Sequence, residues 1–144
     1  MSIGMKDLIA AAEKGDATSQ FNLGVAHENL SNDVGSHGAK GNRTEAIKWL
    51  LQAAQQGLPR AQARLAGIYA GGPEASGDYV RACTWFLLAA TSLSGAQRHS
   101  AQSSYDRIAR HMAPAQIAKA QRLARLWKPK PRDDAALAAP APPA

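Results

Sequence analysis

Cysteine is nearly absent from this chain, and aromatic residues are few. Cys83 is the single cysteine among 144 residues, which excludes an internal disulfide framework and a zinc site built on cysteines. Aromatic residues make up 6% of a chain that is 45% hydrophobic, and alanine supplies much of the apolar fraction. A core of this composition depends on the close approach of backbones more than on large side chains.

Long apolar runs are also missing. No stretch approaches the roughly 18 consecutive apolar residues that suggest a transmembrane helix. The first residues, MSIGMKDLIAAAEKGD, lack the basic region and apolar core of a secretory signal. Together with the scarcity of cysteine, this predicts a cytoplasmic protein, although the sequence also fits a domain of a longer chain.

Constellations of catalytic or metal-binding residues are scarce. Glu13 and Asp16 flank a turn, where capping explains them, and Cys83 has no base nearby in sequence that would make it a nucleophile. We interpret Cys83 as a small buried apolar residue, and we expect no enzyme activity, no metal and no cofactor. Neither His-x-x-x-His nor Glu-x-x-His spacing occurs at the four histidines, His27, His37, His99 and His111.

The chain repeats itself, with a loop of variable length between the copies. A shift of 42 residues superimposes residues 11–15 on 53–57, Gln20 on Gln62 and Leu23 on Leu65. A shift of 36 residues superimposes Ala46, Trp49, Ala53 and Ala54 on Ala82, Trp85, Ala89 and Ala90. The extra residues fall in SNDVGSHGAKGN, residues 31–42, whose composition predicts a loop.

Each copy is predicted to contain a helix A, a loop, a helix B and a tight turn. Gly15 and Gly57 stand where a helix C-terminus needs a left-handed residue, Asp16 can cap the helix that follows, and Pro59 suits a first turn. Helix A carries small residues and leucine near its middle: Ser19, Leu23 and Gly24, then Ala61, Leu65 and Ala66. Helix B carries i, i+3, i+4, i+7 sets: Ala46, Trp49, Leu50 and Ala53, then Ala82, Trp85, Phe86 and Ala89.

This pattern resembles the Sel1-like repeat, a relative of the tetratricopeptide repeat, over roughly residues 8 to 93. The chain departs from the pattern at His27, which replaces a tyrosine, and at Ala66, which replaces a glycine. Met112-Ala113-Pro114 resembles the Met-Thr-Pro that precedes a closing helix in this family, but Ala113 has no side-chain cap to offer. The helix that follows is predicted to carry one stripe, formed by Ile117, Ala120, Gln121, Ala124 and Trp127. The residues that carry the resemblance are Ala53, Ala54, Ala61, Gln62, Leu65, Tyr69, Asp78, Ala82, Trp85, Ala89 and Ala90.

We therefore predict an all-α fold, a right-handed α/α solenoid of about three helix pairs. A repeat domain is expected at 1–128, with units at about 17–56 and 60–92 and a capping pair at 96–128. Residues 129–144 are predicted to form a disordered tail rich in proline and alanine. The seven helices are predicted at about 5–14, 17–30, 44–56, 60–70, 78–92, 96–111 and 115–127.

A solenoid of this kind would act through its surface. The A helices of such a stack line a concave groove that can hold a peptide or a protein, and the resemblance implies scaffolding, signalling, envelope regulation or host interaction in bacteria. We predict a non-enzymatic adaptor with a protein or peptide partner, although ordinary solvated surface would explain the same positions. The candidate groove residues are Asn22, Ala26, Arg64, Ile68, His99 and Gln102.

Positive charge gathers in the last third of the chain and supports an alternative. Residues 98–132 hold nine Lys or Arg against Asp106 alone, a surface that would attract nucleic acid, an anionic membrane or an acidic protein. Nucleic acid is the less favoured partner because no aromatic residues are interleaved for base stacking. The basic candidates are Arg98, Arg107, Arg110, Lys119, Arg122 and Arg125.

Two further classes stay open. Some Sel1-like proteins are linked to β-lactam hydrolysis or binding, but those are expected to be rich in cysteine and secreted, so we do not predict an enzyme here. Self-association is the other candidate, because a short stack exposes two alanine-rich ends and a homo-oligomer would enlarge a modest core.

Overall fold

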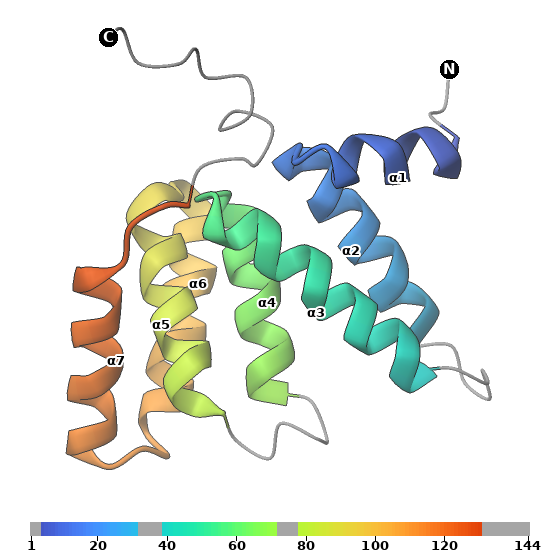
Figure 1. The fold of residues 1–144 in the computed structure, drawn as a ribbon. Coiled ribbons are helices and arrows are strands. Elements are labelled where there is room, and N and C mark those ends of the chain that lie inside the picture. The colour runs from blue at the N-terminus through green and yellow to red at the C-terminus, as the bar shows by residue number, and fades with distance from the viewer. Residues whose placement is uncertain (1–3, 32–38, 72–77, 131–144) are drawn as a thin grey trace, which may run out of the picture. The chain divides into compact units, whose positions relative to one another are not determined.

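The computed structural model describes residues 4–31, 39–71 and 78–130, and these ranges contain seven α-helices and no strand (Figure 1). The predicted all-α fold and its seven helices are confirmed. The helices fall into two compact units, residues 4–56 with 129–130, and residues 57–128. Their bounds are α1 Met5–Glu13, α2 Ala17–Ser31, α3 Ala39–Gln55, α4 Pro59–Gly71, α5 Tyr79–Ser92, α6 Gly95–Ala109 and α7 Pro114–Leu126.

The turn from α1 to α2 forms as the sequence predicts. Gly15 has a φ of 101°, which favours glycine because a Cβ would be strained there. The N–H groups of Gly15 and Asp16 donate to the carbonyls of Ala12 and Ala11 at 3.0 and 3.2 Å, the bond pattern of a Schellman motif. Asp16 Oδ2 then accepts from the Ser19 N–H at 2.9 Å and caps α2. Gly57 has a φ of 98° at the equivalent position of the next copy.

In the first unit, α2 packs against both α1 and α3. Leu23, Ala12 and Trp49 form a buried cluster that joins the three helices, and Leu8 packs against it. Gly24 lets α2 and α3 approach closely, because a Cβ at this position would lie 2.7 Å from Leu50 Cγ. The predicted apolar sides of both helices are therefore the sides that face the core.

The start of α3 is a correction to the predicted loop. Glycine and asparagine in residues 31–42 favour a loop, yet α3 begins at Ala39 rather than near residue 44. His27 Nδ1 and Asn42 Oδ1 lie 3.2 Å apart, so a contact from α2 supports the first turns of α3. Tertiary contacts override weak local propensity in this way.

In the second unit, α5 is the central helix and packs against α4, α6 and α7. Its buried side is correspondingly broad and includes Cys83, Trp85, Phe86 and Leu88. Trp85 meets Trp127 edge to face, with ring centroids 6.2 Å apart. Within this unit α5 and α7 run in the same direction, while α4 and α6 run in the opposite one (Figure 1).

At the start of α7, only one of the two hydrogen bonds of a capping box forms. Gln116 Oε1 accepts from the Ala113 N–H at 3.1 Å, but the methyl side chain of Ala113 offers no acceptor to the first turn. Along α7, Ala120 is fully buried as predicted, whereas Gln121, predicted on the same apolar stripe, is exposed. The Nε2 of Gln121 donates to Tyr105 Oη at 3.3 Å instead.

The chain beyond α7 is described only as far as Lys130. The Lys130 N–H donates to the Gln55 carbonyl at 2.6 Å. The rest of the predicted tail, residues 131–144, lies outside the described residues, as does His37.

Candidate functional site

The predicted binding positions of the A helices lie on the sides of α2 and α4 that turn away from the core. On α2, Asn22 is exposed and Ala26, one turn further along, is half-buried. On α4, Arg64 is exposed and Ile68 is half-buried in the same way. The two helices thus present equivalent surfaces, as the repeat predicts, but each belongs to its own unit.

The remaining predicted positions lie on α6. His99 and Gln102 are both exposed there. Since the second unit spans residues 57–128, it carries four of the six predicted groove residues.

The buried Gln20 is the centre of a hydrogen-bond network that the sequence showed only as a position of the repeat. Gln20 is 2% exposed, and its Nε2 donates to the Ala12 carbonyl and to Gln52 Oε1, both at 3.1 Å. Gln56 Nε2 donates in turn to the Gly15 carbonyl and to Gln20 Oε1, both at 2.9 Å. This network satisfies the carbonyls at the end of α1 and ties that turn to α3. Its role is therefore structural.

The six basic candidates are all exposed. Arg98, Arg107 and Arg110 lie on or directly after α6, and Lys119, Arg122 and Arg125 lie on α7. Within the described part of the chain, no ion pair involves any of the six. Residues 98–128 hold seven Lys or Arg against Asp106, so this pair of helices presents a strongly positive surface.

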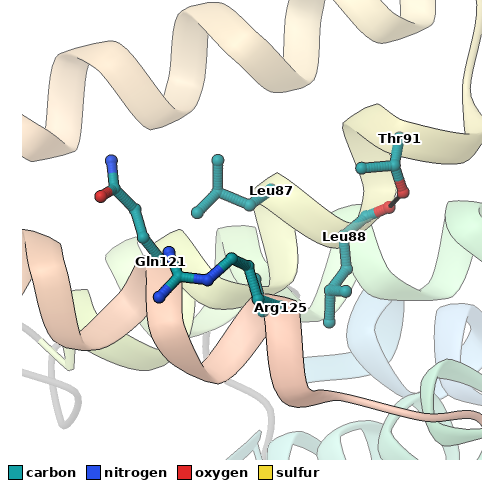
Figure 2. Close-up of a pocket in the computed structure, with 6 residues that line it drawn as sticks. Leu87, Leu88, Thr91, Gln121 and Arg125 are labelled. Carbon is teal, nitrogen blue, oxygen red and sulfur yellow. Dashed lines mark hydrogen bonds between the residues drawn. The ribbon is translucent and has the colours of Figure 1, made fainter.

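A groove between α5 and α7 was not predicted from the sequence. It is an open, mostly apolar trough of about 330 Å³ within the second unit (Figure 2). The only sign of it in the sequence is Gln121, a polar residue inside an otherwise apolar stripe. The lining residues are Leu87, Leu88, Thr91, Gln121, Ala124 and Arg125.

Cys83 has the surroundings of a core residue. Its side chain is fully buried, and its Sγ lies 3.4 Å from Met112 Sδ. Burial raises the pKa of the thiol to about 11, so the group stays protonated near neutral pH. A thiol in this state is a poor nucleophile, which agrees with the interpretation of Cys83 as a small apolar residue.

We expect Cys83 to be unreactive toward a thiol reagent such as Ellman's reagent at pH 8 until the chain unfolds. Because the folded pKa of about 11 lies above the ordinary value of 9.0, the thiol adds stability that is complete below pH 9 and falls as the pH rises toward 11. The check is the labelling rate with and without urea. Rapid labelling of the folded chain would show that Cys83 is accessible.

No three His, Cys, Asp or Glu side chains gather within metal-binding reach among the residues that the structure describes. His111 instead packs against the Tyr79 ring, with centroids 6.4 Å apart. In the described ranges, no helix is both long enough and apolar enough to cross a membrane.

Comparison with known families gives one match. The family model of the Sel1 repeat matches residues 17–58 and 59–92, which contain the α2–α3 and α4–α5 pairs. A comparison with curated proteins finds no match. The matched ranges contain both tryptophan-bearing helices of the repeats, so the features that predicted the repeat lie within the family match.

Proposed function

Since the chain belongs to the Sel1 repeat family, whose repeats generally mediate protein–protein interaction, we propose that it is a non-enzymatic adaptor that binds a partner protein or peptide through the outer sides of its A helices. One observation carries the proposal. Two consecutive repeats expose equivalent positions, Asn22 and Arg64, next to buried positions that hold each helix in place.

The physical basis is a rigid surface with variable side chains. Leu23 and Leu65 are 1% and 0% exposed, so the backbones of α2 and α4 are fixed by packing. The backbone that carries the outer side chains then has little freedom to lose on binding, which favours affinity. Ala26 and Ile68 lie one turn from Asn22 and Arg64. They add apolar surface against which an apolar side chain of a bound segment can pack.

The test is capture of partners from a lysate of the source organism by the immobilised chain, with quantitative mass spectrometry. We expect Arg64→Glu to reduce the captured partner about fivefold or more, since reversing one charge at an interface costs roughly 1 kcal/mol or more. Lys48→Glu makes the same charge change on the exposed side of α3 and should leave capture unchanged.

Circular dichroism of both variants should show unchanged helicity. Equal capture by Arg64→Glu and the unchanged chain would count against the A-helix surface as the binding site. Equal losses in both variants would indicate that only overall charge matters.

A second function is favoured by the positive surface of α6 and α7. Binding of a polyanion through these residues would be driven by the release of counterions, so it should weaken steeply as salt is raised. Salt-insensitive binding to heparin or single-stranded RNA, or no binding at all, would remove this alternative.

A further inference from the structure

The α5–α7 groove has an apolar floor formed by two leucines of α5. Leu87 is half-buried and Leu88 is 8% exposed, although α5 packs against three other helices of its unit. Thr91 Oγ1 donates to the Leu88 carbonyl at 2.7 Å, so this hydroxyl is already used. The small Ala124 on α7 leaves the trough open. Such a floor gains most by covering an apolar side chain.

Helix register places Arg98 of α6 near this groove, although Arg98 is not one of the residues that line it. The bond between Tyr105 Oη and Gln121 Nε2, 3.3 Å long, fixes where α6 and α7 meet. Because the two helices run in opposite directions (Figure 1), residues before Tyr105 lie alongside residues after Gln121. Arg98 comes seven residues before Tyr105, about two helical turns, so it shares the side of α6 that carries Tyr105.

On this register, the groove has one cation in its wall and a second on the neighbouring helix α6. Arg125 belongs to the α7 wall (Figure 2), and Arg98 stands on the α6 side. Both are exposed, and neither forms an ion pair with any residue in the described ranges. The C-terminal ends of α5 and α7 add a partial negative charge of about half a unit each, which the full positive charges of Arg98 and Arg125 outweigh.

From this juxtaposition we propose that the α5–α7 groove is a docking site for an acidic amphipathic segment of a partner protein. Apolar side chains of that segment lie on Leu87 and Leu88, and its carboxylates face Arg98 and Arg125. An amphipathic helix with anchors at i, i+3, i+4 and i+7 is the usual occupant of such a groove. The site goes beyond the proposed function because it does not use the outer sides of α2 and α4.

Other occupants fit these features less well. A nucleic acid would use the cations but not the leucine floor, which offers no aromatic ring for base stacking. A small ligand is usually enclosed on most sides in a pocket of about 300–1,000 Å³, whereas this trough of about 330 Å³ is open. An open apolar floor with positive charge beside it matches a segment that carries leucine-like side chains and carboxylates together.

Three fluorescein-labelled peptides test the chemistry, with binding to the full chain measured by fluorescence anisotropy. The probe is a helical peptide with Leu at i, i+3, i+4 and i+7 and Glu at most other positions. One companion replaces Glu with Lys, and the other replaces Leu with Ser. We expect Kd to be at least tenfold weaker for each companion. Equal binding of the Ser companion would overturn the proposal, because charge alone would then suffice.

Paired charge reversals test the location. Arg98→Glu with Arg125→Glu should weaken binding of the Glu–Leu probe at least tenfold. The matched control is Arg107→Glu with Lys119→Glu, which reverses two charges on the same helices. These residues lie two positions from Tyr105 and Gln121, on sides that do not face the groove. The control should change Kd less than about threefold, and equal losses in both pairs would contradict the proposal.

Leu87→Ser tests the floor, and its helicity can be checked by circular dichroism because Leu87 is only half-buried. We expect at least a fivefold loss of affinity for the probe. No loss, together with displacement of the probe by single-stranded RNA or phosphatidylserine vesicles, would assign the surface to polyanions. A tenfold gain in affinity for a chain ending at Lys130 would assign the groove to residues 131–144. Either result would overturn the proposal.

Discussion

Replacing Trp85 with alanine is expected to lower the free energy of unfolding by about 3–5 kcal/mol, the usual cost of removing a buried tryptophan side chain. Trp85 is 9% exposed and stands on the one helix that contacts α4, α6 and α7. Its ring also meets Trp127 edge to face. The loss is large compared with a typical total stability of roughly 5–15 kcal/mol.

Urea unfolding followed by circular dichroism at 222 nm measures this effect. Trp127→Ala serves as a comparison, because Trp127 is only half-buried and should cost clearly less. Trp85→Phe should recover part of the loss, since an aromatic ring would still fill most of the space. A loss below about 1 kcal/mol for Trp85→Ala would mean that α5 is not the central helix of its unit.

Two glycine-to-alanine changes, one in each A helix of the repeats, are expected to change the free energy of unfolding in opposite directions. Gly24 lies in α2, where a Cβ would come within 2.7 Å of Leu50 Cγ and 3.3 Å of the Ala46 carbonyl oxygen. Gly24→Ala should therefore destabilise the chain by about 1–3 kcal/mol through overpacking. Gly67 in α4 would place an added methyl group with nothing within 4 Å, so Gly67→Ala should stabilise by about 0.5–1 kcal/mol.

The same urea titrations compare the two variants. Since both changes add one methyl group inside a helix, intrinsic helix propensity favours both to a similar degree. Any difference in sign must then come from the contact between α2 and α3. Stabilisation of the chain by Gly24→Ala would show that these two helices do not approach as closely as the structure has them.

Features set by neighbouring residues could be predicted from the sequence. Gly15 and Asp16 define a helix stop and a helix start within a few residues, and the structure has both. The tryptophan-bearing sides of α3 and α5 follow from helical periodicity, and Trp49 and Trp85 are buried at 7% and 9% exposure. Local sequence carries this information because capping and periodicity act within one or two turns.

Features set by distant residues could not be predicted. The first turns of α3 are supported by the contact of His27 with Asn42, which no local pattern reveals. Gln121 looked like part of a buried stripe, but its amide reaches Tyr105 on another helix. The groove beside it depends on the spacing of α5, α6 and α7, and periodicity along one helix does not determine that spacing.

One of the two candidate binding surfaces could be predicted from the sequence, and the other could not. Exposure of Asn22 and Arg64 follows from the burial of their neighbours, so their position was predictable. The position of Arg125 beside an apolar floor was not, because it depends on how α5 and α7 pack. The repeat pattern thus identifies where the backbone is rigid, while the chemistry of a surface depends on which helices meet.

Site-specific photocrosslinking tests the central claim that the outer sides of the A helices bind the partner. A photoreactive phenylalanine analogue is placed at Asn22 or Arg64, and separately at Lys48 of α3 or Arg81 of α5, which are also exposed positions but lie on B helices. The account predicts adducts with the captured partner from Asn22 and Arg64, and few or none from Lys48 and Arg81. Adducts that form from Lys48 and Arg81 but not from Asn22 and Arg64 would contradict it.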